Sequence, residues 1–81
     1  MSQRYRREVL DQLAVHGIRP TDTTPPQVVH DFVNDLYRYE LRRLRDGLLG
    51  KDIAKSEYFS RVVRIRQRYP LLSLKLWQWL E

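Results

Sequence analysis

The sequence of 81 residues contains no cysteine. A disulfide framework and a thiolate metal site are therefore both excluded, and the absence suits the reducing cytoplasm, where we expect the protein to reside. Histidine is scarce too, since only His16 and His30 occur. A zinc site needs about three or four ligands, which are typically closely spaced histidines or cysteines, so we expect no metal.

Long apolar runs are also missing. A membrane-spanning helix needs about 18 or more consecutive apolar residues, and no stretch of the sequence approaches that length. The first ten residues, MSQRYRREVL, carry positive charge, but no apolar segment follows them, which is not typical of a signal peptide. We therefore expect no membrane span.

Glycine is rare as well, and Gly17, Gly47 and Gly50 are too scattered to form a loop that cradles phosphate groups. There is no Gly-x-Ser-x-Gly motif, and without cysteine the usual thiol nucleophile is missing. His16 stands at the expected end of a helix, where the helix dipole favours a cation. We therefore expect no catalytic residue and no cofactor, and we predict that the protein is not an enzyme.

The most informative feature that is present is a long amphipathic stretch over residues 25–49. Apolar side chains recur there every three or four positions, as in a helix with one buried face, and they are Val29, Val33, Leu36, Tyr37, Leu41, Leu44 and Leu48. At about 1.5 Å per residue, this helix would be roughly 37 Å long. We predict one unbroken rod along which the rest of the chain packs.

The start of this rod carries a capping signal. Thr24 is a good N-cap residue, Pro25 suits the first helical position, and Gln27 stands where a capping box has a Glu or Gln. The sequence therefore predicts that the Thr24 side chain caps the long helix.

A first, shorter helix is predicted between Ser2, a good N-cap residue, and His16. Gly17 would close this helix in the left-handed conformation, and Ile18 would fold back onto it, as in a Schellman motif. Residues 18–24 show no periodicity and are predicted to form a loop.

A third helix is predicted over residues 55–69. Its apolar stripe consists of Tyr58, Val62, Ile65 and Tyr69, widened by Phe59 and Val63. Pro70 would end it, because the residue before a proline avoids helical geometry. Ile53 would fill the turn between the long helix and this one.

The last twelve residues, PLLSLKLWQWLE, fit two conformations. The alternating leucines resemble a strand, but no second strand candidate exists to pair with it. We therefore expect either a short helix from Ser73 or an extended apolar tail on the bundle. In a helix, Trp77 would share a face with Leu76 and Leu80, and Trp79 would lie near the edge of that face.

Together these features predict an all-α fold and a single helical domain over residues 1–81. Three helices would form a small antiparallel arrangement around the long central one. The short C-terminal apolar segment would pack on it and complete the core.

Charge is the most function-like signal in the sequence. The net charge is +5, but residues 1–37 hold four arginines against five acidic residues, whereas residues 38–69 hold eight arginines and two lysines against four. These two regions therefore carry −1 and +6. A basic region of this kind is typical of a surface that meets phosphates, although ordinary solvated helix faces explain it equally.

Arginines recur at helical spacing in this basic region, as a row of Arg38, Arg42 and Arg45 and a row of Arg61, Arg64 and Arg68. Antiparallel packing of their helices would merge the rows into one surface. We expect some ion pairs within a helix, namely Asp35–Arg38, Glu40–Arg43, Asp46–Arg42 and Glu57–Arg61. The candidates for phosphate binding are Arg38, Arg42, Arg45, Arg64, Arg66 and Arg68.

Aromatic side chains suggest a second kind of surface. Tyr39 lies off the main apolar stripe, and Trp77 and Trp79 fall within the last five residues. Tryptophan and tyrosine are favoured at protein interfaces, so these three residues are candidates for partner binding. The tryptophans fit docking on their own bundle as well, whereas Lys75 alone is a poor anchor for a membrane surface.

Residues 41–72 loosely resemble the helical hairpin of SHOCT-like short bacterial domains. There a leucine-rich helix ends in glycine and is followed by an isoleucine and a Glu-aromatic pair, and the matching residues are Gly50, Ile53, Glu57 and Tyr58. Ala54 departs from the pattern, which prefers Thr or Ser as a cap. The resemblance covers less than half of the chain and implies a hairpin but no activity.

The sequence leaves two functional hypotheses. The first is a non-enzymatic helical interaction module that binds a protein partner or forms a homo-oligomer. The alternative is a nucleic-acid-associated protein that contacts phosphates non-specifically through its arginines, with binding that weakens steeply with salt.

Overall fold

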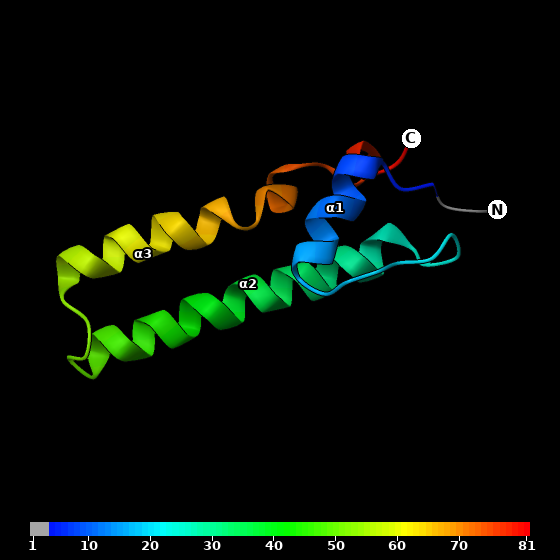
Figure 1. The fold of residues 1–81 in the computed structure, drawn as a ribbon. Helices are drawn as coiled ribbons and strands as arrows, with labels where there is room; N and C mark the ends of the chain where they lie inside the picture. Colours follow the sequence, from blue (N-terminus) through cyan, green and yellow to red (C-terminus); the bar gives the residue numbers. More distant parts are fainter. Residues whose placement is uncertain (1–3) are drawn as a thin grey trace.

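The computed structural model describes residues 4–81, and this part of the chain is all-α, as predicted. Its elements are α1 (Arg7–Val15), α2 (Pro26–Leu49), α3 (Lys55–Gln67) and two short 3-10 turns, η1 (Pro70–Ser73) and η2 (Leu76–Trp79). The molecule is elongated, with extents of 50 × 19 × 16 Å. Figure 1 shows that α2 and α3 run antiparallel, while α1 and the C-terminal turns lie at one end. None of the described helices is long and apolar enough to cross a membrane.

Helix α2 is the unbroken rod that the sequence predicts, and α3, η1 and η2 all contact it. Its predicted apolar face points into the core, where Val29, Val33 and Leu44 are buried. The core of the described residues contains Tyr5, Val9, Leu13, Val29, Val33, Leu44, Ile65, Tyr69, Leu71 and Trp79. The rod therefore positions every other segment, because each one buries its apolar side against this helix or its neighbours.

The predicted Thr24 cap is wrong. The helix begins at Pro26 with Pro25 as its N-cap residue, and no side chain caps it. The Thr24 hydroxyl instead accepts a hydrogen bond from the Thr21 N–H over 3.0 Å, within the preceding turn. Pro26 has no N–H to satisfy, so the first turn of the helix needs less capping. Gln27 turns to Asp31, with Nε2 donating to Oδ1 over 2.7 Å.

Helix α1 ends as predicted and begins later than predicted. Gly17 has a φ of 76°, and the N–H groups of Gly17 and Ile18 donate to the carbonyls of Ala14 and Leu13 over 3.0 Å, which is a Schellman motif. The proposed cap Ser2 lies outside the described residues. The segment before Arg7 is extended rather than helical.

This extended segment pairs with the end of the chain. Tyr5 and Leu80 form an antiparallel bridge, with hydrogen bonds of 2.9 Å from Arg6 N to Trp79 O and from Glu81 N to Arg4 O. The Tyr5 side chain is buried, and its hydroxyl donates to the Thr24 carbonyl over 2.6 Å. The C-terminal segment therefore has a strand-like partner after all, and this partner is a segment that the sequence predicted to be helical.

Helix α3 covers nearly the predicted range but buries a narrower face. Ile65 is buried, whereas Phe59 and Val63 are 61% and 53% exposed, so the expectation that they widen the buried stripe is wrong. Near the α2–α3 connection, α2 is the helix beside α3, because α1 and the C-terminal turns lie at the opposite end of the molecule (Figure 1). Ile53 packs against the core from the connecting turn, as predicted.

The C-terminal segment is neither one helix nor a fully extended tail. It forms two 3-10 turns, in which Trp79 is 0% exposed and Trp77 is 68% exposed, the reverse of the expected arrangement. In a 3-10 turn the side chains at positions i and i+3 lie above each other. Leu76 and Trp79 therefore share the inward side, and Trp77 faces outward.

Candidate functional site

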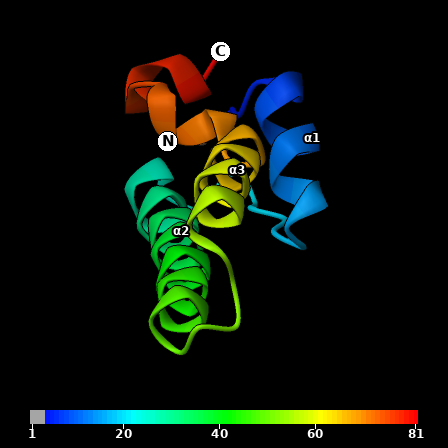
Figure 2. The same cartoon turned by 90° about the vertical axis from the view of Figure 1, so that its left-hand side faces the viewer.

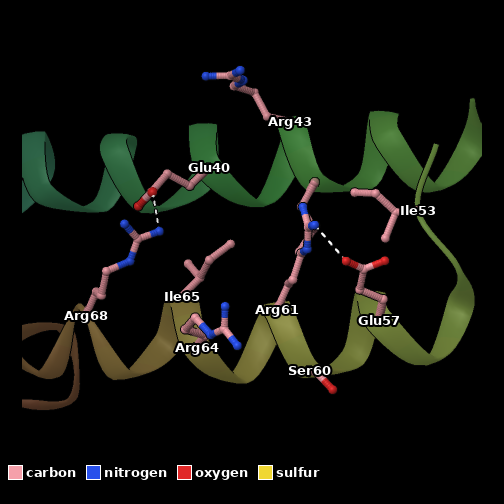
Figure 3. Close-up of a pocket in the computed structure, with 10 residues that line it drawn as sticks. Glu40, Arg43, Ile53, Glu57, Ser60, Arg61, Arg64, Ile65 and Arg68 are labelled. Atoms are coloured by element: carbon pink, nitrogen blue, oxygen red, sulfur yellow. Dashed lines mark hydrogen bonds and ion pairs between the residues drawn. The ribbon is translucent and has the colours of Figure 1, made fainter.

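An open groove of about 550 Å³ lies between α2 and α3 (Figure 3). Its apolar lining comes from Leu44, Ile53 and Ile65. Its polar lining consists of Glu40, Arg43, Glu57, Ser60, Arg61, Arg64 and Arg68. Four arginines against two glutamates give the groove a net charge of +2, so it favours anionic groups with an apolar part.

Two ion pairs occupy part of this groove. Arg61 Nη2 lies 2.7 Å from Glu57 Oε1, which is the predicted pair within α3. Arg68 Nη2 lies 2.6 Å from Glu40 Oε1 and links α3 to α2 across the groove (Figure 3). The sequence instead paired Glu40 with Arg43 and left Arg68 alone, because it could not show which side chains meet between helices.

Tyr69 completes a polar cluster at the end of α3. Its hydroxyl donates a hydrogen bond to Glu40 Oε2, and the His16 ring stacks on it with a centroid distance of 4.5 Å and an angle of 6°. Burial, and then the Glu40 carboxylate, raise the pKa of Tyr69 to about 12. The phenol therefore stays protonated at neutral pH and serves as a donor that joins α3 to α2.

His16 belongs to the same cluster. Its Nε2 atom lies 3.0 Å from the Arg68 carbonyl oxygen. The sequence placed His16 as a cation at the end of its own helix, but the structure turns the ring toward α3. The side chains of Glu40, Arg68, Tyr69 and His16 link the ends of α1 and α3 to each other and to α2.

The structure splits the predicted arginine rows. Arg64 and Arg68 line the groove, as does Arg61 of the same row, whereas Arg38, Arg42, Arg45 and Arg66 do not. The arginine rows of the two helices therefore do not meet in this groove. On α2 the arginine that lines the groove is Arg43, which the sequence had assigned to an ion pair. Its guanidinium lies 5.9 Å from the centre of the Tyr39 ring.

Most arginines of the basic region lack an acidic partner. All eight are exposed, and within residues 4–81 only Arg61 and Arg68 among them lie within 4.0 Å of a carboxylate oxygen. The predicted pairs of Asp35 with Arg38 and of Asp46 with Arg42 do not form. Six arginines therefore remain available to an anionic partner.

The aromatic candidates divide into exposed and buried residues. Tyr39 and Trp77 are 57% and 68% exposed, so both are accessible to a partner. Trp79 is wholly buried and docks on its own bundle, so its assignment to partner binding is corrected. Its ring lies 5.6 Å from that of His30, and Trp79 Nε1 and His30 Nδ1 are buried without a hydrogen-bond partner in the described structure.

Other exposed apolar side chains were missed by the sequence reasoning. The complete set of large exposed apolar residues in the described chain is Val15, Val28, Phe32, Tyr39, Leu49, Phe59, Val63 and Trp77. Val28 and Phe32 are four residues apart on α2, and so are Phe59 and Val63 on α3, so each pair shares a helix face. The i, i+4 spacing was visible in the sequence, but only the structure shows that nothing covers these faces.

The described residues contain no group of three His, Cys, Asp or Glu side chains that could hold a metal ion. Comparison with models of known protein families, with characterised proteins and with solved structures found no match. Helices α2 and α3 form the hairpin that the resemblance of residues 41–72 to SHOCT-like domains implied (Figure 1).

Proposed function

We propose that the protein is a non-enzymatic interaction module that binds a protein partner or a second copy of itself through its exposed apolar side chains. The observation that carries this proposal is the outward-facing position of Val28 and Phe32 on α2 and of Phe59 and Val63 on α3. Single exposed apolar residues are ordinary, but neighbouring ones on one face are typical of interaction sites. Trp77 adds an exposed indole, a side chain favoured in interfaces.

The test measures association of the purified protein and of single variants at these positions. Light scattering over a range of protein concentrations would detect a homo-oligomer, and capture by the immobilised protein would detect another partner. Phe32→Ala, Phe59→Ala and Trp77→Ala should each keep the helical circular dichroism, and at least one should lose the association. The proposal would be refuted if the wild-type chain stays monomeric and if every protein that it captures is also captured by all three variants.

Nucleic-acid binding is the second candidate, and the six unpaired arginines favour it. Binding through phosphates would retain the protein on heparin and would weaken steeply as salt increases. Arg64→Glu combined with Arg66→Glu should then abolish retention without unfolding the protein, because both side chains are exposed and unpaired. Arg68 is unsuitable for this test, since Glu40 binds it. No retention of the wild-type protein at low salt would eliminate this candidate.

A further inference from the structure

Helix α2 carries a second periodic face opposite its buried one. Residues on this face recur at alternating intervals of four and three, and they are Val28, Phe32, Asp35, Tyr39, Arg42, Asp46 and Leu49. All seven are exposed, and we call them the outer seam. Alternating spacings of four and three are the pattern by which one helix packs along another. The seam therefore has the periodicity of a helix–helix interface without a helix on it.

Its apolar residues are distributed along the whole rod. Val28 and Phe32 lie near one end, Tyr39 lies in the middle and Leu49 lies at the other end, and each is more than half exposed. Figures 1 and 2 both show α2 at the edge of the molecule, with α3 on one side of it. A second rod could thus lie along the free side of α2.

The charges of α2 are divided between its halves. Residues 26–37 contain Asp31 and Asp35 and no lysine or arginine, which gives −2. Residues 38–49 contain four arginines against Glu40 and Asp46, which gives +2. Neither Asp35 nor Arg42 makes an ion pair within the described chain. Both halves of α2 thus present charge. A partner with opposite polarity, meaning one that places basic groups beside residues 26–37 and acidic groups beside residues 38–49, would neutralise both.

An antiparallel copy of the same helix has that polarity. It sets the acidic half of each rod beside the basic half of the other, and it brings Val28 and Phe32 near the partner's Leu49 end. A parallel copy would instead place Asp35 beside Asp35 and the arginines beside arginines, which is unfavourable. A twofold axis near the middle of α2 would generate both contacts at once, as in most homodimers.

We propose that the outer seam binds a second copy of this chain, with the two α2 helices packed antiparallel about a twofold axis. This inference rests on the proposed function and specifies its partner. A nucleic acid fits the seam poorly, because Asp35 and Asp46 on the seam would repel its phosphates. An unrelated acidic peptide would neutralise the arginines of α2, but it would not neutralise the acidic half at residues 26–37.

The experiment uses two charge-reversed proteins and their mixture in analytical ultracentrifugation. Asp31→Arg with Asp35→Arg makes α2 basic throughout, and Arg38→Glu with Arg42→Glu makes its basic half acidic. Each protein alone should dissociate, with a dimer Kd at least about tenfold above that of the wild type, because like charges then face each other. An equimolar mixture should recover a species of the mass of one dimer.

Matched controls distinguish an effect of charge on the seam from an effect of net charge or of misfolding. Glu8→Arg with Asp11→Arg, on exposed positions of α1, makes the same change in charge as the first variant, and Arg64→Glu with Arg66→Glu on α3 matches the second. Both controls should dimerise like the wild type. Phe32→Ser should weaken the dimer, whereas Phe59→Ser on the outer face of α3 should not. Circular dichroism confirms the helical content of every variant.

Three outcomes would overturn the inference. A wild-type chain that is monomeric at high protein concentration excludes a self-partner, while a captured protein that the Phe32→Ser variant loses would still support the proposed function. If both charge-reversed proteins still dimerise, the dimer interface lies elsewhere on the surface. A mass increase that disappears after nuclease treatment assigns the association to nucleic acid.

Discussion

Arg68 and Glu40 join the end of α3 to the middle of α2 through a contact of 2.6 Å between Nη2 and Oε1. The other carboxylate oxygen of Glu40 accepts a hydrogen bond from the Tyr69 hydroxyl. The Glu40 carboxylate thus binds two neighbouring donors that directly follow α3. Because Tyr69 is 7% exposed and the Arg68 side chain is 55% exposed, the two contacts should contribute unequally to stability.

Glu40→Ala should lower the free energy of unfolding by about 1–3 kcal/mol, because it leaves the buried Tyr69 hydroxyl without an acceptor. Arg68→Ala should cost less than about 1 kcal/mol, since an exposed ion pair contributes little. Urea unfolding of both variants measures the difference. Equal losses would show that the ion pair, and not the phenol, is the important contact.

Stability should fall in strongly alkaline solution. The pKa of Tyr69 is raised from 10.0 to about 12 in the folded protein, and burial also raises the pKa of Tyr5. Folding therefore favours the neutral phenols, and their contribution is complete below pH 10 and disappears as the pH rises toward 12. Titration of tyrosinate absorbance should show a late step that Tyr69→Phe reduces. A titration curve whose alkaline end is the same with and without Tyr69→Phe would contradict this prediction.

The helices were predictable because their signals are local. The apolar period of α2 and the Gly17–Ile18 ending of α1 each depend on residues within a few positions of one another. The contact of Tyr5 with Leu80 joins residues at opposite ends of the chain. No local pattern specifies such a pairing, and therefore the sequence misplaced both the start of α1 and the conformation of the last segment.

The candidate surfaces were predictable to a similar extent. Helical spacing placed Arg61, Arg64 and Arg68 on one face correctly, but the rotation of α2 against α3 determines that Arg43 joins them. The outer seam was also present in the sequence as a second period in α2. It was hidden because apolar residues were assigned to the core by default, and their exposure depends on which helices are neighbours.

The two tryptophans should respond oppositely to substitution. Trp79→Ala should cost about 3–5 kcal/mol, because it empties the core at a fully buried position, and a domain of this size has little stability to lose. Trp79→Phe should cost less, since it keeps the aromatic contact with His30 and removes an indole N–H that has no acceptor. Trp77→Ala should stay within about 0.5 kcal/mol of the wild type. Near-ultraviolet circular dichroism and urea unfolding distinguish the three, and an unfolded Trp77→Ala variant would reverse the assignment.

Gly47 and Ile53 should be energetically coupled. A Cβ atom at Gly47 would lie 2.6 Å from Ile53 Cδ1, so the end of the Ile53 side chain would have to shift. Gly47→Ala should therefore destabilise the wild-type protein, although alanine is favoured over glycine inside a helix by about 1 kcal/mol. Ile53→Val removes the Cδ1 atom, and in that background Gly47→Ala should become neutral or stabilising. A double-mutant cycle of unfolding free energies measures this coupling. If the two substitutions are additive, Ile53 is free to rotate away, and the turn does not depend on the missing side chain of Gly47.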